Sequence, residues 1–367
     1  MSASFLDHIG DIEDPRVPGM VLYPLQEIVL TVLVGLLCRA EDFDEIEEVC
    51  GELRDWLRLF LPFEHGIAPA QTLRRTLARL DPRALEAAFT AWMEGLAGRI
   101  RGVVAIDGKT LRGSKRSALG EGALHLVQAW AHETGLMLAQ RAVDGKSNEI
   151  TAIPELLRML ALEGAIVTID AMGTQKQIAA EIVAKKADYV LALKANQGML
   201  EEDAELFFAD PVLTADCPGH EHTVVGHGRI EERTIRAADA RWLAERHPEW
   251  QGLASIAAVT VRRTVKRTGA VSTETRLFIS SLPPDPVRLA AAIRAHWSIE
   301  NNLHWVLDVI FREDECRTRK DHSARNLAMI RRAVLNLLRR EPSDKSLKRK
   351  RLKALMSPDF RAAILAG

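Results

Sequence analysis

The chain has 367 residues, of which 47% are hydrophobic and 27% charged, and its formal net charge is −1 at pH 7. This composition is typical of a globular protein, and the length suggests two or three domains. The longest apolar run, residues 28–38, is too short to span a bilayer, and the first residues do not resemble a signal peptide. The four cysteines form no CxxC pair, so we expect reduced thiols and a cytoplasmic protein with no membrane partner.

Charge is distributed unevenly along the chain. Residues 1–63 contain 13 acidic and 4 basic residues, a net charge of −9. Residues 331–353 contain 10 basic and 2 acidic residues, a net charge of +8. A basic C-terminal tail, which we place at 341–367, can be a solvated end or a segment that contacts nucleic-acid phosphates. The charge pattern alone leaves both interpretations open.

Residues 1–95 show apolar side chains at helical spacing, which predicts an all-helical N-terminal domain. Asp81 followed by Pro82 is typical of an N-cap and a first-turn proline, so this pair separates two helices. The first of the two carries three arginines, Arg74, Arg75 and Arg79. Such a pair can be a helix-turn-helix that binds DNA ends, or part of a helical bundle with exposed arginines.

A mixed α/β pattern begins at about residue 96. Residues 103–107, 123–135 and 135–143 predict three strands in a meander. A helix is expected next, begun by Asn148 or Thr151 with Pro154 in its first turn, and then a strand at 165–171. A capping box from Thr174 to Gln177 opens the following helix. A strand at 188–194 and a helix at 198–208 complete this part. Three leading strands followed by alternating helices and strands predict a mixed sheet.

Residues 210–283 interrupt this alternation with β-rich, basic segments, and Thr268-Gly269 predicts a hairpin turn between two of them. Asp285 and Pro286 then open a long helix, and one more helix precedes the basic tail. We therefore expect an α/β domain formed by 96–209 and 284–340, with a β-rich insertion at 210–283.

Two of the predicted strands end on an aspartate. "VVAID" ends on Asp107 and "AIVTID" ends on Asp170. Ligands of open α/β sheets bind at the carboxyl ends of strands, although an aspartate there can instead cap the following helix. The "GKTLRGSKR" after Asp107 is too polar and too rich in glycine to open an ordinary helix, and Thr174 is the better cap after Asp170. These differences favour a functional site.

The long helix after Asp285 has one polar stripe on a largely apolar surface. Its members lie at successive i, i+4 steps: His296, Glu300, His304 and Asp308. Because most other faces are apolar, we expect the stripe to be buried against groups that need polar partners, and Trp297 to lie in the core rather than to form a base-stacking platform. The alternative is the exposed stripe of an amphipathic helix.

Asp107, Asp170 and Glu300 together form a set of hard oxygen ligands. Such a set suits Mg²⁺ or Mn²⁺ rather than zinc. Two such ions about 4 Å apart can promote phosphodiester chemistry.

The order of these three carboxylates resembles the catalytic DDE triad of insertion-sequence transposases. The segments "AIDGKTLRGS", "VTIDAMGTQKQIA", "DYVLALKANQ" and "HWSIENNLHWVLDVIFREDECR" are similar to transposases of the ISAs type, which include the H-repeat-associated proteins. The resemblance covers about residues 95–335, and the first 95 residues resemble the helical domain associated with that family. The wider DDE group has a Y-R-E-K signature whose other members fall here on Ile293, His296 and Leu307, so only the glutamate is kept.

The resemblance implies a ribonuclease-H-like fold in which Asp107, Asp170 and Glu300 bind two Mg²⁺ (or Mn²⁺) ions. It also implies that double-stranded DNA is the partner, as element ends and as target, and that the protein acts as a homodimer on DNA, associated with the nucleoid. No small-molecule substrate is expected. The residues expected to contact DNA are Lys109, Arg112, Lys115, Arg116, Lys194, Asn196, Arg229, His296, Asn301, Asn302 and His304. For each of them the alternative is an ordinary solvated or structural side chain.

Two other functions stay open at this point. One is a metal-dependent nuclease of the same fold that cuts DNA without joining it. The other is a domesticated or decayed transposase that binds DNA without catalysis, as a repressor or an architectural protein. The intact triad argues against this last function, while the near-neutral charge and the missing Y-R-E-K partners leave it open.

Overall fold

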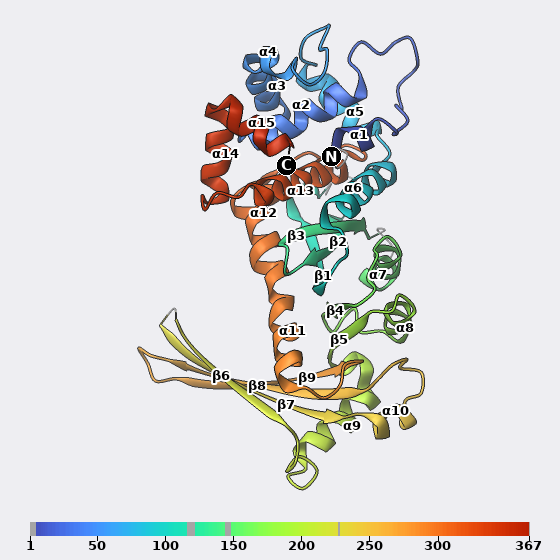
Figure 1. The fold of residues 1–367 in the computed structure, drawn as a ribbon, viewed down its shortest axis with the longest axis vertical. Coiled ribbons are helices and arrows are strands. Elements are labelled where there is room, and N and C mark those ends of the chain that lie inside the picture. The colour runs from blue at the N-terminus through green and yellow to red at the C-terminus, as the bar shows by residue number, and fades with distance from the viewer. Residues whose placement is uncertain (1–4, 116–121, 144–147, 227, 367) are drawn as a thin grey trace.

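The computed structural model describes residues 5–115, 122–143, 148–226 and 228–366. Figure 1 shows an elongated molecule with a helical end, which holds both termini, and a sheet that continues to the opposite end. No helix within these described ranges is both long enough and apolar enough to cross a membrane.

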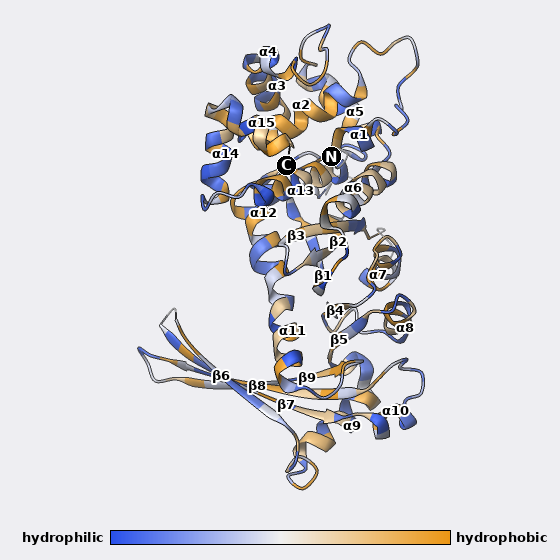
Figure 2. Cartoon of the chain, in the orientation of Figure 1, coloured by the Kyte–Doolittle hydropathy of each residue, from blue (hydrophilic) through white to orange (hydrophobic). Residues whose placement is uncertain are grey.

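The helical end is built around one almost entirely buried helix. The chain begins with α1 (Phe5–Ile9), α2 (Leu25–Leu37), α3 (Phe43–Glu52), α4 (Arg54–Leu57), α5 (Ala70–Arg79) and α6 (Pro82–Ala97). Figure 2 shows that α2 is hydrophobic along its length, and nearly all of its side chains are buried. The Asp81 carboxylate accepts a hydrogen bond from the Arg83 amide at 2.9 Å, so the predicted cap of α6 is confirmed.

The basic C-terminal segment is folded onto these helices. It forms α14 (Leu347–Met356) and α15 (Pro358–Ala366), which follow α13 (Ser323–Arg340) and pack against it, and α14 also contacts α2. Lys350 donates to the Leu338 carbonyl at 3.1 Å, and Arg351 donates to the Leu36 carbonyl at 2.8 Å. These carbonyls belong to the last turns of helices, where unpaired C=O groups and the helix dipole attract cations. Lys350 and Arg351 are therefore neither solvated nor available to contact phosphates, so both interpretations of the basic tail are wrong for these two residues.

In the described part of the chain, nine strands form a single sheet, which makes up the rest of the molecule together with its flanking helices. In spatial order it runs β3 (Leu136–Ala142), β2 (Leu124–Ala131), β1 (Gly102–Leu111), β4 (Ala165–Ile169), β5 (Asp188–Leu193), β9 (Val271–Ser280), β8 (Ser255–Val265), β7 (Arg229–Asp239) and β6 (Gly219–Gly226). The expected meander of β1, β2 and β3 is confirmed as antiparallel, and β4 and β5 run parallel to β1. The strands of the β-rich segment extend this same sheet, because β9 pairs antiparallel with β5.

Helices cover the two faces of the sheet differently. α7 (Glu149–Arg158) and α8 (Lys176–Ala184) pack on one face, and α11 (Pro286–Ile299) runs along the other, as Figure 1 shows. The alternation of strand side chains separates two cores. Val104 packs with the α7 and α8 side, whereas Val103 packs with Leu289 of α11. The remaining short helices of this part are α9 (Gly198–Ala209) and α10 (Arg241–Arg246).

Several local predictions are settled by the structure. Asn148 caps α7 by accepting from the Ile150 amide, as expected, but Pro154 lies inside the helix beyond its first turn. The predicted turn at Gly269 is confirmed by its positive φ of 69°. The capping box at Thr174 was wrong, because the Thr174 hydroxyl donates to the Ala192 carbonyl at 2.6 Å and α8 begins after Gln175.

Two further corrections concern the site. Asp107 does not end its strand: β1 continues to Leu111, because β2 pairs with it along its whole second half. Trp297 does not lie in the core, since it is 50% exposed, with the Arg276 guanidinium 5.4 Å from its ring centre.

Candidate catalytic site

Asp107 and Asp170 lie next to each other at one edge of the parallel part of the sheet. The β1–β4 ladder ends with the pair Ile106 and Ile169, and each aspartate is the next residue along its strand. Both isoleucines are buried on the side of α7 and α8. Since successive side chains of a strand alternate between faces, both carboxylates point to the opposite face, where α11 lies.

The polar stripe of the long helix meets this edge. His296 Nδ1 lies 3.1 Å from the Thr168 hydroxyl of β4. The helix then widens into one π-helical turn, η4 (Glu300–His304), before α12 (Trp305–Val309). Single π turns inside α-helices are frequent at functional sites. The prediction that the stripe packs against polar partners is confirmed for His296.

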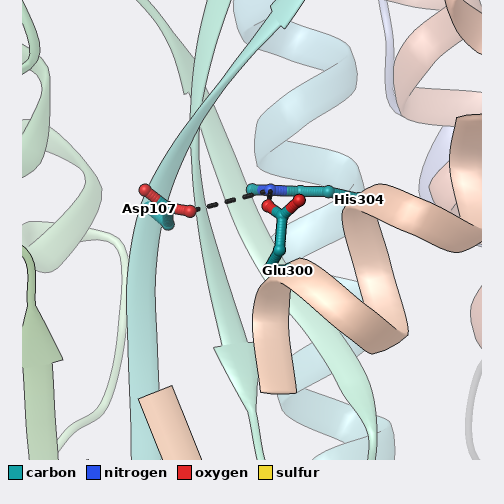
Figure 3. Close-up of side chains that lie close together, drawn as sticks. All are labelled: Asp107, Glu300 and His304. Atoms are coloured by element: carbon teal, nitrogen blue, oxygen red, sulfur yellow. Dashed lines mark hydrogen bonds and ion pairs between the residues drawn. The ribbon is translucent and has the colours of Figure 1, made fainter. Parts of the chain in front are cut away.

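The π turn places Glu300 and His304 opposite Asp107 (Figure 3). His304 Nδ1 lies 3.1 Å from Glu300 Oε2 and 3.7 Å from Asp107 Oδ2. One ligand atom of each residue lies within 4.8 Å of the others, which is compact enough to hold one metal ion. Asp170 is not part of this group, although its charge acts on Asp107.

The donor set of this group fits a divalent cation. Two carboxylates suit Mg²⁺ and Mn²⁺, and an imidazole adds preference for a transition ion such as Mn²⁺. The histidine departs from the ligand set of three carboxylates that the sequence predicts.

Burial and neighbouring charges tune the acids of the site. Burial raises the pKa of Asp107 to about 6, helped by the negative charges of Asp170 and Glu149 and opposed by His304. The hydrogen bond with His304 lowers the pKa of Glu300. Burial lowers the pKa of His296. Among the acids of the site, Asp107 is thus the one whose pKa a bound cation would lower most, because its charged form is the least favourable when no cation is present.

The second half of the long helix is tied to β1 by a buried ion pair. Lys109 Nζ donates to both carboxylate oxygens of Asp308 at 2.7 Å, and the lysine side chain is only 6% exposed. Next along the chain, Glu313 is completely buried and accepts from Arg332 at 2.9 Å. These contacts hold the helix end against the sheet. Lys109, predicted to contact DNA, is committed to Asp308 in this structure.

The other candidates in the loops around the site are exposed. Arg112 is 84% exposed on its side chain and lies 3.5 Å from Asp314, and Lys115 is exposed. Lys194 and Asn196 are exposed after β5, and the Asn196 amide also donates to the Ala171 carbonyl at 2.8 Å. Arg116 lies outside the described residues.

The remaining candidates differ in how they are held. Arg229 of β7 is exposed and pairs with Glu231 at 2.8 Å. Asn301 and Asn302 are exposed on the π turn, and the Asn301 amide donates to the Trp297 carbonyl at 3.1 Å. His296 and His304 face the sheet and its acids instead.

One acid beside the site was missed by sequence reasoning. Glu149, the first residue of α7, lies 2.6 Å from His125 of β2, and its charge raises the pKa of Asp107. A β-carbon at Gly108 would fall 2.1 Å from the Glu149 carboxylate, so this approach requires glycine. No pattern in the sequence marks Glu149, because an acid in the first turn of a helix is ordinary.

Comparison with known proteins agrees with this geometry. Residues 98–337 match the family described as transposase DDE domain, and residues 6–93 match a second family described as associated with it. The chain belongs to the DDE-transposase family. The matched range spans the strands and the helix that bring Asp107, Asp170 and Glu300 to one edge.

This member of the DDE-transposase family is similar to proteins of Escherichia coli and Xanthobacter autotrophicus. A protein of E. coli O157:H7 provisionally named as transposase YncI is 38% identical, with 99% of this chain and 95% of the relative covered. The H repeat-associated protein YhhI of E. coli K12, also provisionally named as a transposase, is 35% identical, with 99% of this chain and 97% of the relative covered. An uncharacterised protein of Xanthobacter autotrophicus is 41% identical, with 75% of this chain and 93% of the relative covered. The resemblance to the H-repeat-associated group is confirmed.

Proposed function

We propose that this transposase cleaves phosphodiester bonds at the ends of an insertion sequence and joins the resulting 3′-hydroxyl to target DNA. The observation that carries the proposal is the meeting of Asp107, Glu300 and His304 at the sheet edge, with Asp170 on the neighbouring strand. The two alternatives, a nuclease that does not join DNA and a non-catalytic DNA-binding protein, are outcomes of the test below.

We also propose that the catalytic domain is ribonuclease-H-like. The strand order β3-β2-β1-β4-β5, with three antiparallel strands followed by two parallel ones, supports this assignment. The domain is proposed to comprise 96–209 and 284–340, with the insertion at 210–283. The helical residues 1–95 are proposed to bind element ends.

Asp107, Asp170 and Glu300 are the proposed ligands of two Mg²⁺ or Mn²⁺ ions, and His304 is placed to add one nitrogen. When bound, such ions lower the pKa of an attacking hydroxyl and stabilise the leaving 3′ oxygen. The chain itself fixes the carboxylates. Asp107 is held by the ladder of β1, and Glu300 is oriented by His304. Asp107 must be ionised to act as a ligand, so binding of the cations releases a proton below about pH 6.

The exposed polar candidates near this edge, together with Arg229 of β7, are proposed to hold the DNA backbone. They are Arg112, Lys115, Lys194, Asn196, Arg229, Asn301 and Asn302. Basic and amide side chains of this kind fix the register of DNA by contacting phosphates. Because an element has two ends, we propose a homodimer on DNA, acting at the nucleoid.

A joining assay tests the function. Purified protein is mixed with Mn²⁺, a pre-nicked duplex that carries the element end, and a supercoiled target plasmid. A transposase produces plasmids covalently linked to the labelled 3′ end. Cleavage of an intact end without such products indicates a nuclease. DNA binding without either product indicates a non-catalytic protein.

A further inference from the structure

A cationic cavity of about 620 Å³ lies between the helical end and the segment that follows the catalytic helix. Its walls are α3, α5 and residues 312–320, which include the short helix η5 (Glu313–Glu315). Six cations line it: Arg74, Arg75, Arg312, Arg317, Arg319 and Lys320. Among the described residues that line the cavity, the opposing charges are three acids, Glu41, Asp42 and Glu315.

Three of the six cations are already engaged. Arg74 pairs with Asp44, Arg312 pairs with Glu41 at 2.8 Å, and Arg319 donates to the Gly113 carbonyl at 2.7 Å. The other three are exposed and have neither an ion pair nor a hydrogen bond from their side chains to any described residue: Arg75, Arg317 and Lys320. Unpaired cations from two separate elements therefore face one hollow.

The walls of the cavity are fixed to each other. The His322 amide donates to the Ala78 carbonyl of α5 at 3.2 Å, and the Asn326 side chain donates to the Leu77 and Leu80 carbonyls at 2.8 Å. The backbone of α5 and the segment that carries Arg317 and Lys320 are thus linked to each other by hydrogen bonds. The entropy lost when a ligand binds therefore comes from ordering the cation side chains rather than from bringing the two elements together.

The cavity is also connected to the segment that follows β1. The short helix η1 (Arg112–Ser114) packs on η5, and a β-carbon at Gly113 would fall 2.2 Å from the Cys316 carbonyl. Arg112 and Lys115 in that segment are exposed. A row of cations therefore leads from the strand that carries Asp107 to the cavity between the helices.

We propose that this cavity binds phosphates of the DNA backbone, with Arg75, Arg317 and Lys320 as the contacts. The proposal rests on the proposed function, and it adds the path that DNA takes from the catalytic edge to the helical end. The ligand is a polyanion rather than a single small anion, because exposed cations continue from the cavity toward β1, although Arg112 among them pairs with Asp314 at 3.5 Å. A DNA backbone has this form, with one negative charge per about 1.7 Å of duplex axis.

The test compares two triple variants by fluorescence anisotropy with a labelled 30-base-pair duplex in EDTA, between 50 and 200 mM salt. The first variant is Arg75→Ala/Arg317→Ala/Lys320→Ala. The matched control removes three other exposed cations outside the cavity, Arg99→Ala/Lys186→Ala/Arg246→Ala. Any duplex serves as probe, because backbone binding does not depend on sequence.

The cavity variant is expected to bind at least tenfold more weakly at 50 mM salt. Its slope of log K against log salt should be smaller by about 2 to 3, since each phosphate contact contributes about 0.9. An affinity and slope equal to those of wild type and control would overturn the cavity assignment and leave the proposed function intact. Failure of wild type to bind any duplex would overturn both. Should the triple variant not fold by circular dichroism, the single charge reversal Arg317→Glu is measured, with Lys186→Glu as control, and must weaken binding selectively.

Discussion

Lys109 Nζ and the two carboxylate oxygens of Asp308 are joined by two hydrogen bonds of 2.7 Å that tie β1 to α12. The partners are not equally accessible, because the lysine side chain is 6% exposed and the aspartate 33%. Removing Asp308 and removing Lys109 should therefore lower the free energy of unfolding by different amounts.

We expect Asp308→Asn to destabilise the protein more than Lys109→Met does. The first change leaves a buried cation without its counter-charge and should cost about 2–4 kcal/mol, whereas the second leaves a carboxylate that water can reach and should cost about 1–2 kcal/mol. Urea unfolding of both variants and of the double variant measures this order and the coupling. Equal small losses without coupling would contradict the structural role of the pair. A DNA-binding salt slope reduced by about 0.9 in Lys109→Met would instead support the DNA contact expected from the sequence.

Asp107 should make stability depend on pH when no metal is present. Its pKa in the folded state, about 6, lies above the ordinary value of 3.8, so ionisation disfavours the fold. The penalty is absent below about pH 3.8 and complete above about pH 6. In EDTA, Asp107→Asn should therefore become more stable relative to wild type as pH rises from 4 to 8, by on the order of 2 kcal/mol. A stability difference that does not change with pH would contradict the burial and repulsion described for this carboxylate.

Glu313 should be essential for the fold. Its carboxylate is fully buried, and Arg332 and Arg331 lower its pKa against the opposing effect of burial. Glu313→Gln leaves these arginines buried without a counter-charge, so we expect a loss of about 3–5 kcal/mol. Exposed Glu315, two residues away, provides the control, and Glu315→Gln should change stability little. Similar small losses in both variants would argue that Glu313 is not needed.

His304 should influence which cation the site prefers. Its Nδ1 lies with the carboxylates of Asp107 and Glu300, and imidazole favours Mn²⁺ over Mg²⁺. In thermal unfolding, wild type should be stabilised by both ions and more by Mn²⁺. His304→Gln should narrow this difference, and Glu300→Gln should weaken stabilisation by either ion. Equal stabilisation of all three proteins would place the metal elsewhere.

Sequence patterns predicted that three carboxylates lie near one edge of the sheet, but not their detailed arrangement there. Asp107 and Asp170 could be placed at one edge because both follow apolar strand segments, and Glu300 because a polar stripe interrupts an apolar helix. The contact of His304 with both carboxylates could not be predicted, since it depends on a π turn fixed by packing against the sheet. The engagement of Lys109 by Asp308 depends on the same long-range packing.

The C-terminal segment shows a different limit. Lys350 and Arg351 belong to a run of basic residues that is usually solvated. They are buried because carbonyl groups at the ends of α13 and α2 accept their hydrogen bonds, and those carbonyls lie close only in the folded protein. The pairing of β9 with β5 is equally non-local, so the sequence could indicate a β-rich insertion but not that it extends the central sheet.

The most direct test of the proposed catalytic site is Mn²⁺-dependent cleavage of a labelled element end by Asp107→Asn, Asp170→Asn and Glu300→Gln. Asp239→Asn, at the end of β7, serves as a matched control outside the site. We expect each of the three variants to lose cleavage by at least a hundredfold while binding DNA as wild type does, and the control to cleave normally. Undiminished cleavage by any of the three would contradict the assignment of these carboxylates as the catalytic triad.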